Sequence, residues 1–311
     1  MTVAPSPDRP LRLGTRGSPL ALTQAGMVAA ALCEAHGWPA DAISIVTVKT
    51  SGDRIQDRAL ADVGGKALWT KELDHALLDG DIDFAVHSMK DVETIRPDSI
   101  AIATMLPRAD VRDRLIGAPS IAALREGAVV GTSSPRRAAQ LRRLRPDLTI
   151  TLFRGNVATR LAKLETGEAD ATLLAAAGLD RLGQGDVGAP IPLDLMLPAP
   201  AQGAVGVEVR ADDDAMREAL AAIADADTVD CVLAERSLLL GLGGTCHSPI
   251  AALARVDGDT VHLRAEILSE NGDRHVGGEA RFARGDHDAA RALGVSLLER
   301  APDTLRALFA A

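Results

Sequence analysis

Strand-like and helix-like segments alternate along most of this chain. The strand-like segments are rich in Val, Ile and Leu, and 11–15 and 41–50 are the first two. The first helical segment begins at Ser18, which can cap free N–H groups, and ends at Gly37. Strands that alternate with helices of this length pair in parallel and use the helices as crossovers. The sequence therefore predicts an α/β fold.

The last third of the chain has a different order of elements. Two helical segments precede three strands and a final helix, and the triplet NGD at 271–273 reads as a turn between two of these strands. This order predicts an α+β module. A proline-rich stretch at 189–203 is typical of an extended crossing between domains. At ~150 residues per domain, 311 residues are enough for two or three domains.

Composition and charge argue against several functions. A hydrophobic content of 47% supports a folded core, whereas aromatic residues make up only 2% and the formal net charge is -9. Few aromatic rings and an acidic chain oppose binding to nucleic acid, and the charge also opposes anionic membranes. The sequence contains no apolar run typical of a signal peptide or a membrane span. We therefore expect a cytoplasmic protein with no nucleic-acid or membrane partner.

The three cysteines lie in two kinds of context. Cys33 and Cys231 lie within apolar helical patterns and are expected to be inert core thiols. Cys246 lies in the irregular segment GLGGTCHSP, where small neighbours can leave a thiol accessible and His247 can help to form the thiolate. A modified Cys246 and an ordinary loop cysteine are both compatible with this context. No CxxC pair is present, so we expect neither a zinc ribbon nor a disulfide framework, and no metal.

Arginines gather at the start of one helix. Five of them lie between 136 and 145, in SSPRRAAQLRRLR. Arg136 and Arg137 stand in the first turn, where cations oppose the helix dipole, so local stability does not explain them. With Thr132 and Ser134 they are suited to hold a carboxylate or a phosphate. The other three arginines are equally compatible with a solvated helix face.

Further polar residues follow other strands. Ligands of open α/β sheets gather at the carboxyl ends of the strands, where these loops lie. Several loops that each supply an arginine therefore predict a cleft for a ligand with several acidic groups. The residues are Arg16, Ser18 and Gln24 after the first strand, Arg154 and Arg160 after a later strand, and Arg181 in AAGLDRLG.

Lys90 and Asp91 follow the strand 81–86, in the segment HSMKDVET. They could form an ordinary surface pair of little energetic value. Their place at a strand end among arginine loops also suits a functional carboxylate, which nearby positive charges would keep ionised. Such a carboxylate can stabilise a cationic intermediate or exchange protons with a nitrogen.

The segment DVGGKALW contains Gly64, Gly65 and Lys66. It is not a phosphate-binding P-loop, because Leu60 stands where that motif needs an earlier glycine. A flexible surface turn and a mobile lid over a cleft are both compatible with it.

Taken together, these segments resemble the porphobilinogen deaminase family, also called hydroxymethylbilane synthase. The matching motifs run in the family's order from residue 11 to about 250, and so many separate motifs argue against a chance match. They are LRLGTRGSPLAL, VGGKALWTKEL, DFAVHSMKDV, VGTSSPRR, FRGNVATRL, AAGLDRLG, PAQGAVGVE and GGTCHSPI.

The resemblance implies three domains. Two of them are α/β domains like type II periplasmic binding proteins, and the chain crosses between them twice. The third is an α+β domain that carries the cysteine loop. The implied boundaries are 10–106 with 201–221 for the first domain, 107–200 for the second and 222–311 for the third. The resemblance also favours a monomer.

The resemblance further implies a transferase of tetrapyrrole and heme biosynthesis. The family condenses four porphobilinogen molecules head to tail, with release of ammonia, into linear hydroxymethylbilane. The primer is a dipyrromethane cofactor joined by a thioether to the loop cysteine, here Cys246. Porphobilinogen bears acetate and propionate groups, so a growing chain would need many cationic partners.

Matched position by position, the resemblance assigns roles. Asp91 matches the catalytic acid, and Gly64, Gly65 and Lys66 match the flexible loop. The residues expected to hold cofactor carboxylates are Lys90, Thr132, Ser134, Arg136, Arg137 and Arg160. The residues expected to hold the incoming substrate or the growing chain are Arg16, Ser18, Gln24, Arg154, Arg160 and Arg181.

A few positions depart from the usual family motifs. Trp69 stands where phenylalanine is usual, and Pro135 stands where leucine is usual. Gly17 stands where many members have glutamine, and Thr245 replaces a glycine before the cysteine. None of these departures removes a charged residue that is assigned to chemistry.

Two other functions are compatible with a polar cleft. A non-catalytic solute-binding protein for a polycarboxylate is the main alternative, but it gives Cys246 no purpose. A regulatory module that binds an effector is the other, and the sequence shows no DNA-binding segment to go with it.

Overall fold

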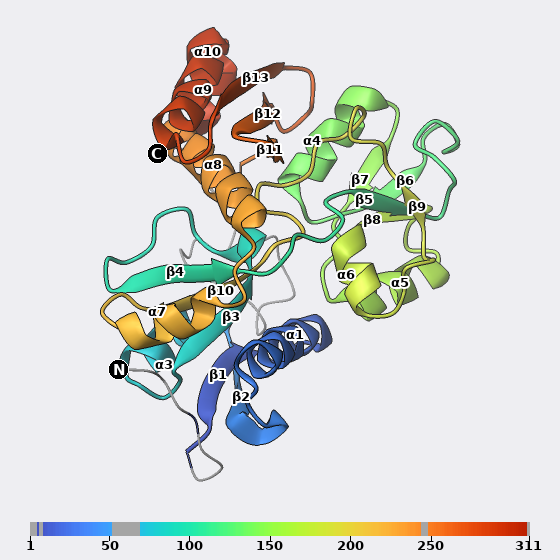
Figure 1. Ribbon diagram of the computed structural model, residues 1–311. Helices are drawn as coiled ribbons and strands as arrows, with labels where there is room; N and C mark the ends of the chain where they lie inside the picture. Colours follow the sequence, from blue (N-terminus) through green and yellow to red (C-terminus); the bar gives the residue numbers. More distant parts are fainter. Residues whose placement is uncertain (1–4, 6–8, 52–68, 244–247, 310–311) are drawn as a thin grey trace. The chain divides into compact units, whose positions relative to one another are not determined.

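A computed structural model describes residues 5, 9–51, 69–243 and 248–309 (Figure 1). Among these residues, the chain forms two compact units. The first contains the described residues up to 51 together with 69–109 and 203–229, and the second contains those of 110–202 and 230–309. Four predicted site residues, Gly64, Gly65, Lys66 and Cys246, lie outside the described residues.

The first unit is built on a five-stranded sheet. Its strands lie in the order β2 (Ile43–Val48), β1 (Leu11–Arg16), β3 (Phe84–Ser88), β10 (Val205–Arg210) and β4 (Ile100–Met105). Strand β1 pairs in parallel with both β2 and β3, whereas β10 pairs antiparallel with β3 and β4. Strand β10 thus enters between β3 and β4, which precede it by a hundred residues or more, and it completes the sheet.

Helices cover this sheet. They are α1 (Pro19–His36), α3 (Lys71–Leu78) and α7 (Asp214–Ala221), with 3-10 turns η1 (Ala40–Ala42) and η3 (Met89–Asp91). Helix α1 begins and ends as predicted, because Ser18 Oγ accepts a hydrogen bond from the Ala21 N–H at 3.2 Å and Gly37 adopts a φ of 65°. The apolar face of α1 lies against β1 and β3, where Leu32 and Phe84 are buried in one core (Figure 1).

The second unit also contains a five-stranded sheet, in which the three parallel strands have the same relative order as in the first. Its strands are β7 (Thr149–Thr151), β6 (Val129–Gly131), β8 (Ala171–Ala175), β5 (Asp113–Ile116) and β9 (Ala189–Pro190). Strand β6 pairs in parallel with β7 and β8, and β5 pairs antiparallel with β8 and β9. The helices that follow β6, β7 and β8 are α4 (Pro135–Leu144), α5 (Val157–Glu165) and α6 (Ala176–Arg181).

The C-terminal part of the second unit is an antiparallel sheet with helices. The sheet contains β11 (Ile250–Asp257), β12 (Thr260–Leu268) and β13 (His275–Ala283). The helices are α8 (Ala226–Leu242), α9 (His287–Arg300) and α10 (Asp303–Arg306), followed by the 3-10 turn η4 (Ala307–Phe309). The first four residues of α8 belong to the first unit. Cys231 is buried in their common core, as predicted, whereas Cys33 is only partly buried. The predicted fold class, two α/β sheets followed by an α+β module, is confirmed.

Candidate functional site

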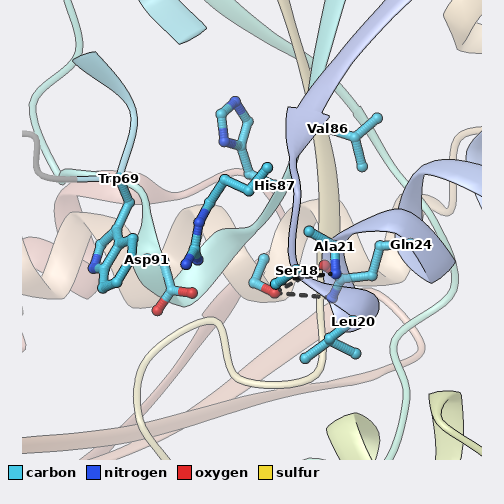
Figure 2. A pocket seen from close by; sticks show the side chains of 10 residues that line it. Ser18, Leu20, Ala21, Gln24, Trp69, Val86, His87 and Asp91 are labelled. Carbon is cyan, nitrogen blue, oxygen red and sulfur yellow. Dashed lines mark hydrogen bonds between the residues drawn. The ribbon is translucent and has the colours of Figure 1, made fainter. Parts of the chain in front are cut away.

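A pocket lies at the carboxyl ends of β1 and β3 in the first unit (Figure 2). Because these two strands are parallel, their ends meet at the same edge of the sheet, and the pocket brings Arg16 and Asp91 together. The lining residues are Arg16, Ser18, Leu20, Ala21, Gln24, Trp69, Val86, His87, Ser88 and Asp91. Lys90 precedes Asp91 in η3 but does not line the pocket.

Helix α1 and strand β3 supply the polar wall of the pocket. Gln24 is buried on α1 and donates from Nε2 to Ser88 Oγ at 2.8 Å. Ser18 stands at the N-terminus of the same helix, so its capping role also holds its hydroxyl at the pocket. The sequence analysis did not identify Ser88 as a site residue. Its position at the end of β3, shortly before Asp91, could have predicted that it lines the pocket.

Trp69 and Asp91 form the opposite wall. In Figure 2, the Trp69 indole and the Asp91 carboxylate lie on the side of the pocket away from Gln24. The guanidinium carbon of Arg16 lies over the Trp69 ring, 3.9 Å from its centroid. The pocket therefore combines a cation, an aromatic face, an amide and a carboxylate, which suits a ligand that has both acidic groups and a planar ring.

His87 turns its ring away from Asp91 (Figure 2). The ring faces Glu208, which belongs to a buried group of charges. His87 Nε2 lies 3.1 Å from Glu208 Oε2, although this contact lacks hydrogen-bond geometry. Arg96 donates to both oxygens of Glu208, at 2.8 and 2.9 Å, and also pairs with Asp74 and Glu93. These buried charges anchor β10 to the strand that leads to Asp91.

The buried charges predict an acid-dependent stability. Burial alone raises the pKa of Glu208, but its contacts with His87 and Arg96 outweigh burial and lower this pKa to about 2. A carboxylate with a lowered pKa stabilises the fold fully above its unfolded pKa of about 4.3, and this contribution is lost as the pH falls toward 2. The pH-dependent part of the contribution is about 3 kcal/mol.

We therefore expect Glu208→Gln to reduce the free energy of unfolding at pH 7, and the difference from the natural protein to shrink below about pH 4.3. Urea denaturation between pH 3 and pH 7 measures this difference. Asp41→Asn, at an exposed carboxylate in η1, is the control and should track the natural protein at every pH. If the difference in free energy of unfolding between Glu208→Gln and the natural protein stayed constant with pH, the lowered pKa of Glu208 would be contradicted.

A second group of predicted residues meets at the strand ends of the second unit. Thr132 and Ser134 follow β6, and Arg154 follows β7. Thr132 Oγ1 accepts from the Ser134 N–H at 3.1 Å, and Ser134 Oγ accepts from the Arg137 N–H at 3.4 Å. Arg160 on α5 donates to the hydroxyl of Ser133, the residue between them, at 3.3 Å. Arg181 is the last residue of α6, the helix that directly follows β8.

Arg136 and Arg137 are both buried, and each pairs with an aspartate of the chain itself. The carboxylate oxygens of Asp113 lie 2.9 Å from Arg136 Nη2 and 2.7 Å from Arg137 Nη2. Gln202 donates to the same carboxylate at 2.8 Å. The two guanidinium groups outweigh burial and hold the pKa of Asp113 well below its usual range. The sequence predicted that Arg136 and Arg137, at the start of α4, bind an anion. In the structure one such anion is the carboxylate of Asp113, which the sequence analysis did not identify.

The structure groups the predicted residues unit by unit. The first unit contains Arg16, Ser18, Gln24, Lys90 and Asp91. The second contains Thr132, Ser134, Arg136, Arg137, Arg154, Arg160 and Arg181. Within the described ranges, no group of three or more His, Cys, Asp or Glu side chains is arranged to hold a metal ion. None of the helices described there has both the length and the apolar composition needed to cross a bilayer.

The two α/β sheets share the relative order of their parallel strands, and each has arginines at the carboxyl ends of these strands. This is the architecture of a protein that binds its ligands at the strand ends. Residues 11–218 match a family model described as "Porphobilinogen deaminase, dipyromethane cofactor binding domain". Residues 229–302 match the model of the C-terminal domain of porphobilinogen deaminase. The chain therefore belongs to the porphobilinogen deaminase family.

Relatives support this membership over nearly the whole length. Porphobilinogen deaminase of Sphingopyxis alaskensis is 59% identical, with 98% of both chains covered. Porphobilinogen deaminase of Paracoccus denitrificans is 52% identical, with 96% of both covered. Among solved structures, a periplasmic substrate-binding protein of an ABC transporter from Coxiella burnetii is similar, with a TM-score of 0.41, 16% identity, and coverage of 70% of this chain and 94% of that chain.

The second unit's donor set fits the dipyrromethane cofactor that the family model describes. Arg136 Nε and Arg137 Nε are buried, and neither donates to an acceptor among the described residues. Buried N–H groups without an acceptor are costly, so the site is suited to a ligand that brings carboxylates. The hydroxyls of Thr132 and Ser134 lie on the same loop and add further polar groups.

Proposed function

We propose that this chain condenses porphobilinogen head to tail, with release of ammonia at each step, into linear hydroxymethylbilane. The observation that carries the proposal is a pocket that brings Asp91 and Arg16 to one strand edge, in a member of this family. The relatives are named as an enzyme, which does not favour the solute-binding alternative.

We assign the catalytic role to Asp91. Loss of ammonia leaves a positive charge on the methylene group and ring of porphobilinogen. A fixed carboxylate stabilises that charge and can exchange a proton with a pyrrole N–H. Support comes from the position of Asp91: its carboxylate lines the pocket and forms neither a hydrogen bond nor an ion pair with another described residue.

We propose that cationic and polar side chains bind the carboxylates of the substrate and of the cofactor. Arg16, Ser18 and Gln24 in the first unit, with Arg154, Arg160 and Arg181 in the second, would hold the substrate or the growing chain. Lys90, Thr132, Ser134, Arg136, Arg137 and Arg160 would hold the cofactor. The cofactor, when bound, would supply the pyrrole carbon that accepts the first substrate ring, and each later ring would be added to the ring before it.

The attachment of the cofactor to Cys246 is tested by intact-mass spectrometry. We expect the purified protein to carry an adduct of two linked pyrroles, and added porphobilinogen to produce heavier species. Cys246→Ser should lack the adduct, whereas Cys33→Ser, at a partly buried thiol, should keep it. An unmodified mass for a protein that releases ammonia from porphobilinogen would contradict the proposal.

We also propose the three domains 10–106 with 201–221, 107–200 and 222–311. Support comes from the sheets, because β10 pairs with strands of the first segment and the C-terminal strands form a sheet of their own. We propose that the protein acts as a cytoplasmic monomer. Cys33 and Cys231 form no disulfide with a described residue, which is consistent with a reducing compartment. Light scattering coupled to gel filtration measures the oligomeric state.

A further inference from the structure

Arg16 lies in the pocket with the carboxylate of Asp91 and the indole of Trp69. An arginine and a carboxylate in one pocket attract each other. Between these two described residues the structure has no ion pair. The Arg16 guanidinium instead lies over the Trp69 ring, 3.9 Å from the centroid.

We propose that Trp69 is a positioning residue, which stacks on the Arg16 guanidinium and, together with the other contacts of Arg16, holds it apart from Asp91. The inference rests on the proposed function of the pocket. A guanidinium that stacks uses its flat face, while its N–H groups project from its edge and can still form a bidentate contact with a carboxylate. Arg16 is thereby directed toward an acidic side chain of porphobilinogen, and the Asp91 carboxylate is left for the positive charge that develops on the ring.

The ring at position 69 matters for this role. Tryptophan presents the largest and most electron-rich face among the aromatic side chains, so it binds a cation best. Phenylalanine can do the same more weakly, whereas leucine fills space without offering a face. The series Trp69→Phe and Trp69→Leu therefore separates the effect of the face from that of apolar bulk.

We expect Trp69→Leu to lower kcat/KM for porphobilinogen about 2- to 30-fold, which is the range of a cation–π contact. Trp69→Phe should recover most of this loss. Trp38→Leu is the matched control, because it removes the chain's other tryptophan, which stacks on His36 and lies outside the pocket. It should leave kcat/KM unchanged. A Trp69→Leu value equal to the control would overturn the proposal.

A second measurement tests the stack without any turnover. In a Trp38→Phe background, Trp69 is the sole source of tryptophan fluorescence. Removing the guanidinium with Arg16→Met should uncover the ring and raise its quenching constant with acrylamide, whereas Lys71→Met, on α3 in the same unit, should not. Unchanged quenching for Arg16→Met would refute the stack even if the protein condenses porphobilinogen. Raised quenching in a protein that never releases ammonia would instead refute the proposed function alone.

Discussion

Replacing Asp91 with asparagine should reduce kcat for porphobilinogen about 10²- to 10⁴-fold, the range expected when a positioned proton-transfer group is lost. Asparagine has nearly the same shape but carries no charge, so it can neither balance the positive charge on the substrate nor accept its proton. The fold should persist, because the Asp91 carboxylate has no hydrogen bond or ion pair with another described residue. Circular dichroism and the adduct mass check the fold and the cofactor.

Two further variants sharpen this prediction. Asp91→Glu keeps the charge but moves it by one methylene, so we expect a rate between those of the natural protein and Asp91→Asn. Asp41→Asn removes one negative charge from an exposed position in the same unit and should leave kcat unchanged. A near-natural rate for Asp91→Asn would remove the catalytic role from this residue.

The second large effect is expected on stability, from Asp113→Asn. Removing this charge leaves Arg136 and Arg137 buried together without their common anion. The new amide also turns a donor toward a guanidinium that itself donates. Breaking a buried ion pair from one side costs about 3 to 5 kcal/mol. Hydrogen exchange of the α4 amides, measured by mass spectrometry, should therefore become much faster.

The same substitution at an exposed pair is the control for Asp113→Asn. Asp303 pairs with Arg306 in the same unit, at 3.6 Å and with the Asp303 side chain 97% exposed. Surface pairs of this kind contribute little, so Asp303→Asn should leave exchange in α4 unchanged. Equal exchange in the two variants would show that Asp113 does not stabilise the arginines.

The sequence predicted the longer elements well, because their local signals agree with their packing. Helix α1 carries both of its caps in the sequence, and the strands predicted at 11–15 and 41–50 form β1 and β2. Strands β5 and β9 were not predicted, because they have only four and two residues and pair with partners distant along the chain. Short strands of this kind are set by tertiary pairing, which no local pattern reveals.

The predicted site shows the same limit. Residues at strand ends, such as Arg16 and Asp91, could be placed together because parallel strands share an edge. Asp113 could not be connected to Arg136, because the contact depends on the unpredicted strand β5. The stack of Arg16 on Trp69 depends on side-chain geometry, for which the sequence contains no signal. The order of the motifs therefore identified the residues of the candidate site. The contacts that hold those residues in place became visible only in the structure.

The place of β10 in the first sheet has a consequence for synthesis on the ribosome. The second sheet is drawn from one continuous stretch, from β5 to β9, and can close as soon as that stretch emerges. Strands β3 and β4 must wait for β10 with facing edges unpaired, and unpaired edges are prone to wrong association. The sheet that a nascent chain begins first is thus the one that it completes later.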